Sequence, residues 1–191
     1  MTTAEQIVSA EASRQQPSAS IVSVASWPAD SVDVRSLVNE YVEWLTAASG
    51  VDPAVVQPSL VAELEAIEQW YAPPNGRMVL ARVDGAAAGI VGIHVLERGV
   101  AELKRVYLRP DARGQDLGRR MTEVAIRESR RLGAKRIVLE TSPRVMPAAH
   151  RIYLERGFRE ISRYSDMEVD GVIAMELRLG LFSGLRHHRG R

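Results

Sequence analysis

The stretch that decides the fold runs from Glu102 to Phe158, and the turn Arg113-Gly114-Gln115-Asp116-Leu117-Gly118 lies near its start. A strand pattern over Ala101–Leu108 precedes this turn, and a helix pattern over Leu117–Leu132 follows it. The start of a helix offers free backbone N–H groups and the positive end of the helix dipole, which together favour an anion. The sequence therefore predicts a turn that holds a phosphate-bearing ligand, with an ordinary strand-to-helix connection as the alternative.

The residues on either side of this unit predict one α/β domain with the order β-α-α-β-β-β-α-β-α-β-β. Short turns such as Asp84-Gly85 predict three antiparallel strands in a row before the phosphate turn. The helix after the turn then acts as a crossover to a parallel strand. The expected sheet is mixed and mostly antiparallel, with six or seven strands flanked by helices. Its expected elements are strand 19–26, a helix from Asp30 or Ser31 to Gly50, a helix from Ser59 to Pro73, strands 78–83, 87–96, 100–108 and 136–140, helix 148–156, and strands 158–162 and 172–179.

The two ends of the chain have a different composition from the domain between them. Residues 1–18 are rich in Thr, Ala, Ser and Gln and predict a disordered tail, whereas residues 180–191 predict a mobile basic tail. The predicted domain therefore covers residues 19–179.

Composition and charge exclude several function classes. The chain has 191 residues, is 46% hydrophobic and carries a net charge of +1, so no global charge points to nucleic acid. It has no cysteine, which rules out disulfides, thiolate metal sites and a cysteine nucleophile. No apolar run is long enough to span a bilayer, and no secretory signal is visible, so a cytoplasmic protein without a membrane or nucleic-acid partner is expected. A homodimer is left open.

The turn does not fit two common phosphate-binding patterns. The chain lacks the P-loop string, and Gly114 and Gly118 do not form a Rossmann Gly-x-Gly-x-x-Gly fingerprint. The turn instead resembles the acetyl-CoA signature of the GNAT superfamily of N-acetyltransferases, Arg/Gln-x-x-Gly-x-Gly/Ala between a strand and a helix. Arg113 and Gly118 match its ends, but Asp116 stands where that pattern has glycine. This departure predicts either crowding and repulsion near the phosphates or a harmless residue at the helix start.

A second motif follows at the spacing expected for the same family. The segment from Ala149 to Phe158 resembles the family pattern Ala-x-x-x-Tyr-x-x-x-Gly-Phe, with its tyrosine at Tyr153. The resemblance covers about residues 19–179. Over this range the chain is similar to small bacterial GNAT enzymes that are uncharacterised. Met146 stands near a position where relatives often have an asparagine that contacts CoA.

The resemblance implies an acetyl-CoA site where the strands at Ala101–Leu108 and Arg136–Glu140 splay apart. In the family, amides of the turn bind the CoA pyrophosphate, and the strand before the turn lies along the cofactor. The residues implied to contact the cofactor are Val106, Tyr107, Leu108, Arg113, Gly114, Gln115, Asp116, Leu117, Gly118 and Arg119.

The resemblance also implies roles in catalysis. Tyr153 corresponds to a tyrosine that protonates the departing thiolate, and a buried aromatic residue with its hydroxyl bonded elsewhere is the alternative. Glu102 is a candidate base for the amine, and an exposed strand carboxylate is its alternative. The N–H of Val106 is a candidate oxyanion donor, because relatives carry a bulge in this strand.

Three functions remain open from the sequence. The first is the transfer of an acetyl group from acetyl-CoA directly to a primary amine of a small molecule. The second is acetylation of a protein or peptide, and the third is a catalytically weak acyl-CoA-binding regulatory domain, supported by Asp116 and Met146. Two acidic groups predict either attraction of a cationic acceptor or solvated surface: Glu63, Glu65 and Glu68 on the outer face of the second helix, and Asp166, Glu168 and Asp170 in the last hairpin. The lone His94 is not expected to bind a metal.

Overall fold

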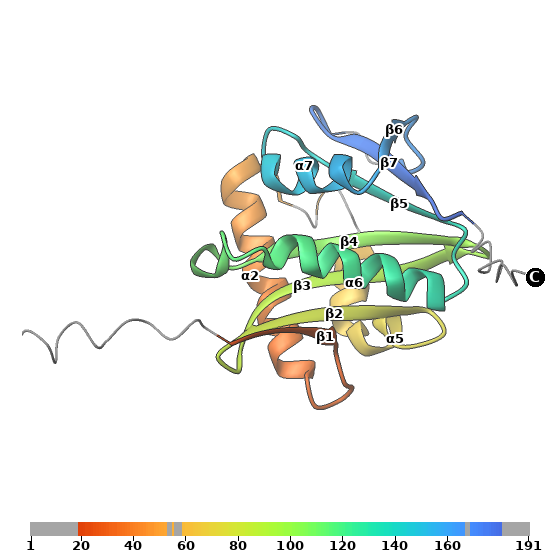
Figure 1. Ribbon diagram of the computed structural model, residues 1–191. Coiled ribbons are helices and arrows are strands. Elements are labelled where there is room, and N and C mark those ends of the chain that lie inside the picture. The colour runs from red at the N-terminus through yellow and green to blue at the C-terminus, as the bar shows by residue number, and fades with distance from the viewer. Residues whose placement is uncertain (1–18, 53–54, 56–58, 167–168, 181–191) are drawn as a thin grey trace, which may run out of the picture.

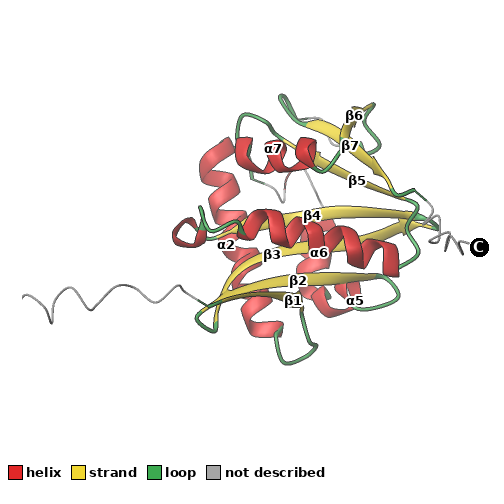
Figure 2. Ribbon diagram, in the orientation of Figure 1, coloured by secondary structure: helices red, strands yellow, loops and turns green. Residues whose placement is uncertain are grey.

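The protein forms a seven-stranded sheet with helices on both faces (Figures 1 and 2). The computed structural model describes residues 19–52, 55, 59–166 and 169–180, so the predicted tails, apart from Gly180, and Glu168 lie outside the described residues. The elements are β1 (Ser20–Val24), α2 (Ser31–Ser49), α4 (Ser59–Glu65), α5 (Ile67–Tyr71), β2 (Gly76–Val83), β3 (Ala86–Glu97), β4 (Val100–Leu108), a 3₁₀ turn (Pro110–Ala112), α6 (Leu117–Arg131), β5 (Arg136–Thr141), α7 (Pro147–Glu155), β6 (Arg159–Ile161) and β7 (Ile173–Arg178).

The strands lie in the order β1-β2-β3-β4-β5-β7-β6, and every neighbouring pair is antiparallel except β4 and β5. The parallel pair arises because α6 carries the chain across one face of the sheet before β5 begins. The predicted mixed, mostly antiparallel sheet is therefore confirmed, with seven strands.

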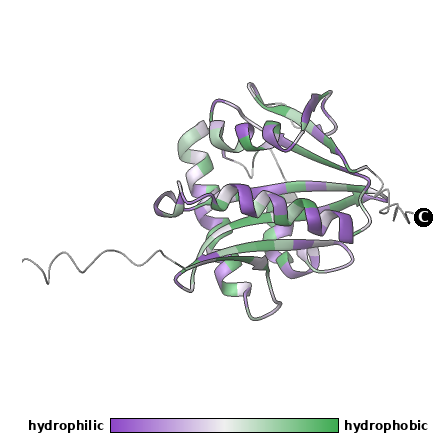
Figure 3. Cartoon of the chain, in the orientation of Figure 1, coloured by the Kyte–Doolittle hydropathy of each residue, from purple (hydrophilic) through white to green (hydrophobic). Residues whose placement is uncertain are grey.

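Two apolar clusters hold the layers together. Helix α6 packs on β1–β4 on one face of the sheet, while α2 and α5 pack against the other (Figure 1). Figure 3 shows hydrophilic residues along the outer side of α6 and mostly hydrophobic residues along the strands beneath it. Helix α6 turns Leu117, Met121 and Ala125 into the core, which is the face that the sequence period predicts.

The centre of the sheet opens where β4 and β5 separate. Their pairing runs from Val100 opposite Arg136 to Leu103 opposite Leu139 and stops there, although β4 continues to Leu108. The separation of β5 from β4 toward the α7 side of the molecule is visible in Figure 1. The splayed strands implied by the family resemblance are therefore present.

A β-bulge interrupts β4 beside this opening. Ile90 pairs with Tyr107 and Gly92 with Lys104, so Arg105 and Val106 together face the single residue Val91. Arg105 adopts φ +54, a left-handed conformation that costs a residue with a side chain about 1–2 kcal/mol.

The second predicted helix differs from its expected form in a way that matters for the site. It is divided into α4 and α5 at Ala66, and the carbonyl of Leu64 accepts a hydrogen bond from the Arg35 guanidinium on α2. The expectation that Glu63 lies on the outer face with Glu65 and Glu68 was wrong, because Glu63 is fully buried. The apolar period of this segment predicts Leu60, Leu64, Ile67 and Tyr71 on the inward face; Leu60, Ile67 and Tyr71 are buried there, and Leu64 is partly buried.

Candidate functional site

Two cavities lie on either side of the bulge in β4. The first, here called the α6 cavity, has a volume of about 530 Å³ and is lined by the turn, the start of α6 and α7. The second, here called the β4–β5 cavity, has a volume of about 730 Å³ and is lined by the diverging strands, α2 and the β6–β7 loop. Both are lined by Val106, Val145, Met146 and Tyr153, so they meet at these four residues.

The α6 cavity collects most of the residues that the sequence predicts to contact the cofactor. Gly114 adopts φ +81, which suits glycine, and α6 begins three residues later at Leu117. Gln115 is the exception, because it is not among the residues that line the cavity. The predicted residues that do line it are Val106, Tyr107, Leu108, Arg113, Gly114, Asp116, Leu117, Gly118 and Arg119.

Asp116 fits the turn although the family pattern has glycine there. Its φ of +59 is a left-handed conformation, which aspartate tolerates better than most residues. Its carboxylate makes no capping hydrogen bond to α6 and instead lies 3.1 Å from Nε of Arg119. The aspartate therefore preserves the backbone shape, and Arg119 partly neutralises its charge.

The arginines near the turn have different partners. The Arg113 side chain donates from Nε to the carbonyl of Leu108, and its guanidinium lies 5.7 Å from the ring centroid of Trp44. By contrast, Arg120 donates to the hydroxyl and carbonyl of Ser20 on β1, at 2.7 and 3.0 Å, and does not line the α6 cavity. Arg113 thus belongs to the cavity, whereas Arg120 fastens α6 to the sheet edge.

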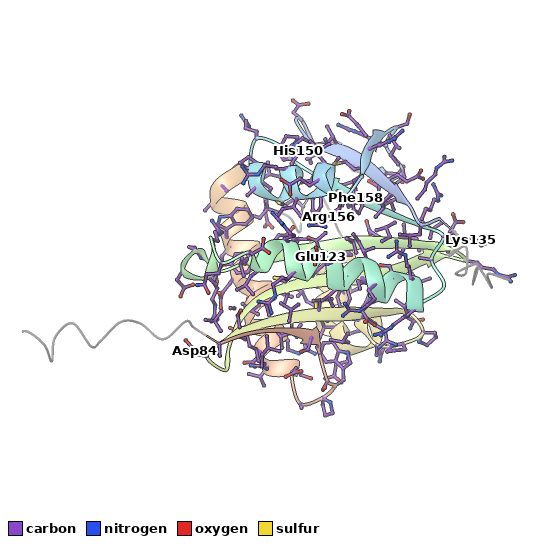
Figure 4. The ribbon with its side chains drawn as sticks, viewed as in Figure 1. Asp84, Glu123, Lys135, His150, Arg156 and Phe158 are labelled. Carbon is purple, nitrogen blue, oxygen red and sulfur yellow. The ribbon has the colours of Figure 1, made fainter. Side chains whose placement is uncertain are left out.

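Helix α7 packs closely against α6 and closes the same cavity. A Cβ at Gly118 would lie 3.2 Å from Cδ1 of Ile152, so this glycine permits the close approach. Arg156 and Glu123 form an ion pair of 2.9 Å between the two helices, and both are labelled in Figure 4. Two residues that sequence reasoning missed, Trp44 and Arg151, also line the α6 cavity. Arg151 lies inside the second motif, where its position could have been noticed, but no local pattern points to Trp44.

The β4–β5 cavity contains Glu102, which is tied to its neighbours. Its carboxylate accepts a 2.9 Å hydrogen bond from the Tyr164 hydroxyl and lies 3.3 Å from Nζ of Lys104. Burial and the charge of Glu102 raise the pKa of Tyr164, so that phenol stays protonated at neutral pH. Glu102 therefore lines a cavity rather than standing on an exposed strand.

A second carboxylate, missed in the sequence, lies in the same cavity. Glu140 stands near the end of β5 and accepts a 2.7 Å hydrogen bond from the Ser165 hydroxyl. Burial raises its pKa, and the nearby charge of Glu102 raises it further. Its place at the carboxyl end of a buried strand was a signal that could have singled it out. From the predicted acidic group in the last hairpin, Asp170 lines the cavity, whereas Asp166 does not.

Tyr153 lies where the two cavities meet. The residue is 2% exposed, and its ring packs on Phe158 with centroids 5.6 Å apart. Burial raises the pKa of its hydroxyl above the usual value, so the phenol holds its proton at neutral pH. No hydrogen bond of this hydroxyl to any residue in the described part of the chain is present, which leaves it available to a ligand.

The described residues contain neither a metal centre nor a membrane-spanning helix. Among them, no three His, Asp or Glu side chains lie close enough together to hold a metal ion. Similarly, none of the helices seen in residues 19–52, 55, 59–166 and 169–180 has the length and apolar character to cross a membrane.

Comparison with known proteins identifies the family. Residues 36–158 match the acetyltransferase (GNAT) family. The chain belongs to the GNAT family of acetyltransferases. An uncharacterised N-acetyltransferase from Schizosaccharomyces pombe is 32% identical to this GNAT chain, over 86% of this chain and 98% of that protein.

Solved structures support the fold of this GNAT acetyltransferase. The yncA protein of Salmonella typhimurium, a putative acetyltransferase with acetyl-CoA as its cofactor, has a TM-score of 0.64 at 23% identity and covers 86% of this chain and 96% of its own. The PaiA N-acetyltransferase of Thermoplasma acidophilum, in complex with coenzyme A, has a TM-score of 0.65 at 16% identity. The match covers 84% of this chain and 99% of the PaiA chain.

Proposed function

We propose that this GNAT acetyltransferase transfers the acetyl group of acetyl-CoA directly to a primary amine of a small molecule. The observation that carries the proposal is the meeting of two cavities at Val106 and Tyr153, beside the bulge in β4. One cavity has the character of a donor site and the other that of an acceptor site.

The α6 cavity has the features that an acyl-CoA needs. The start of α6 presents backbone N–H groups, Gly114 places no side chain over them, and Arg113 adds positive charge. We assign the pyrophosphate to this turn and the rest of the donor to the path along Val106, Tyr107 and Leu108. Acetyl-CoA supplies a thioester, whose acetyl group passes to the amine nitrogen as the carbon–sulfur bond breaks.

The β4–β5 cavity has the features of an amine site of limited size. Residues of α2 and of the segment after it line one side, including Tyr41, Leu45 and Val51. Two carboxylates, Glu102 and Glu140, also line it. A cavity of about 730 Å³ with these walls suits a small acceptor, whereas a protein segment would need a long open groove.

Each reacting group has a residue to serve it. Glu102, directly or through water, takes the proton that the attacking amine loses. The N–H of Val106, displaced from regular pairing by the bulge, stabilises the negative charge on the acetyl oxygen. The Tyr153 hydroxyl gives its proton to the departing sulfur and regains one from water. Holding the two reactants in line supplies much of the remaining acceleration, so the reaction needs no protein nucleophile.

Two measurements on the full chain test this proposal. Calorimetry should detect acetyl-CoA binding without an amine, and a panel of small amines assayed for CoA release should contain at least one good acceptor. Peptide amines that react faster than every small amine would overturn the choice of acceptor. Failure to bind acetyl-CoA, restored by Asp116→Gly, would instead favour the regulatory alternative.

A further inference from the structure

The buried glutamate of α4 lies directly behind the bulge. Glu63 is fully buried and accepts two hydrogen bonds from Arg105, at 2.7 Å from Nε and 2.9 Å from the terminal nitrogen. Burial alone would raise the pKa of Glu63, but the hydrogen bonds and charge of Arg105 outweigh it and hold the pKa below its usual value. The carboxylate is therefore charged at neutral pH and grips the guanidinium at two points.

Arg105 controls the orientation of the amide assigned to the oxyanion. The peptide unit that contains the Val106 N–H begins at Arg105, so the backbone angle ψ of Arg105 sets the direction of that N–H. Arg105 is 3% exposed and adopts φ +54, a conformation that persists only where its surroundings hold it. The ion pair with Glu63 stabilises this conformation, because two hydrogen bonds fix both the position and the plane of the Arg105 guanidinium.

The same carboxylate also reaches the candidate base. Its second oxygen lies 3.4 Å from Nζ of Lys104, and that nitrogen lies 3.3 Å from Glu102. On the other side, Tyr71 donates its hydroxyl to the first oxygen at 2.5 Å. The Tyr71 ring packs so tightly on Gly92 that a Cβ there would lie 2.6 Å from it, and Gly92 pairs with Lys104 across the sheet. Tyr71 thus holds the Glu63 carboxylate in place. The carboxylate in turn contacts Arg105, which precedes the Val106 amide, and Lys104, which contacts Glu102.

We propose that Glu63 is a positioning residue for acetyl transfer, which locks the bulge at Arg105 so that the Val106 amide points at the acetyl oxygen and which aligns Glu102 through Lys104. This inference rests on the proposed function. Simple stabilisation is a weaker account, because buried ion pairs can often be replaced by apolar residues without loss of stability.

The test compares Glu63→Gln with Glu128→Gln. Glu128 is a matched control: it is 2% exposed and pairs with Arg77, Arg127 and Arg131, but it lies on α6 and lines neither cavity. Glu63→Gln should lower kcat for the best amine of the panel by about 100-fold, the typical effect of misplacing a reacting group by a small distance. The Kd for acetyl-CoA should stay within about two-fold, because Glu63 does not line the α6 cavity and the pyrophosphate turn is unchanged. Glu128→Gln should lower the melting temperature and leave kcat unchanged.

Amide hydrogen exchange provides a readout that needs no acceptor and no donor. In the ligand-free protein, Glu63→Gln should increase exchange by about ten-fold at the amides of Lys104 and Tyr107, which pair with β3 on either side of the bulge, whereas Glu128→Gln should not change it. This measurement separates the two proposals. A chain that fails to bind acetyl-CoA refutes the proposed function, whereas unchanged exchange beside the bulge in Glu63→Gln refutes the lock.

A double variant separates positioning from stability. Glu63→Gln removes the carboxylate charge that Arg105 contacts at two points, so the buried guanidinium is less well compensated. Glu63→Gln/Arg105→Gln removes the guanidinium charge as well, so the double variant should recover part of the melting temperature. If Glu63 positions the bulge, kcat stays low in the double variant while stability returns. Recovery of kcat together with the melting temperature would show that Glu63 acts only on stability and would overturn the proposal.

Discussion

The α6 cavity and the β4–β5 cavity are built in different ways. Apart from Trp44, the α6 cavity is formed by three short stretches of chain, residues 106–108, 113–122 and 145–155, and the backbone of the turn supplies the groups expected to bind phosphate. The β4–β5 cavity depends on side chains brought together from distant segments: Glu63 meets Arg105 across 42 residues, and Tyr164 meets Glu102 across 62. We expect substitutions on the first side to change donor affinity and substitutions on the second to change turnover.

The largest expected effect lies at the junction of the two cavities. Tyr153→Phe removes the hydroxyl assigned to the leaving sulfur and should lower kcat by about 100-fold or more. Because the hydroxyl makes no hydrogen bond within the described part of the chain, the melting temperature and the Kd for acetyl-CoA should remain close to wild type. Steady-state CoA release and calorimetry on the same preparation measure both quantities. Unchanged turnover would remove Tyr153 from the acid role.

The difference between the two cavities also explains what the sequence could predict. The turn from Arg113 to Gly118 and the segment around Tyr153 are contiguous motifs, and all of their predicted residues except Gln115 line the α6 cavity or the junction. The bulge and the splayed strands followed from the family resemblance, whereas the sheet followed from the strand patterns and the short turns between them.

The contacts on the acceptor side were beyond the sequence. The prediction grouped Glu63 with Glu65 and Glu68 by charge. Glu63 follows Leu60 by three residues and precedes Ile67 by four, so the helical period itself places it on their inward face. Its partner Arg105 lies 42 residues away, and no local pattern could have revealed that contact.

A ten-fold effect is expected on donor affinity alone. Arg113→Ala removes a cation beside the proposed pyrophosphate site and should raise the Kd for acetyl-CoA by about ten-fold, or about 1.4 kcal/mol. The loss should shrink at high salt, because added ions screen the exposed charge. Arg120→Ala is the matched control, since this arginine contacts Ser20 instead and should change the melting temperature but not the Kd. Equal losses of affinity in both variants would indicate a general charge effect rather than a site.

A smaller effect on the same side separates charge from backbone shape at Asp116. Asp116→Asn keeps a residue that tolerates positive φ and removes the carboxylate, so it should tighten acetyl-CoA binding by about three-fold, or about 0.7 kcal/mol. Asp116→Gly should tighten binding by a similar factor if charge is the cause. Tighter binding only in the glycine variant would mean that the Cβ, and not the charge, limits affinity.

The smallest expected effect lies on the acceptor side, at Glu140. Because burial raises its folded-state pKa above the unfolded value of about 4.3, folding favours the protonated form. The charged form therefore destabilises the fold above the folded-state pKa, and this penalty disappears as the pH falls below the unfolded value. Glu140→Gln should accordingly raise the melting temperature by about 1 °C near pH 8, a small gain because solvent screens a half-exposed group, and by nothing near pH 4.

Glu160→Gln is the control for this comparison, since Glu160 is exposed on β6 and lines neither cavity. Turnover of the same Glu140 variant then decides between the two carboxylates of the cavity. If Glu102 takes the amine proton, Glu140→Gln retains most of its kcat and Glu102→Gln does not. The reverse order would transfer the role of base to Glu140, because the pKa raised by burial makes Glu140 a better proton acceptor than an ordinary carboxylate.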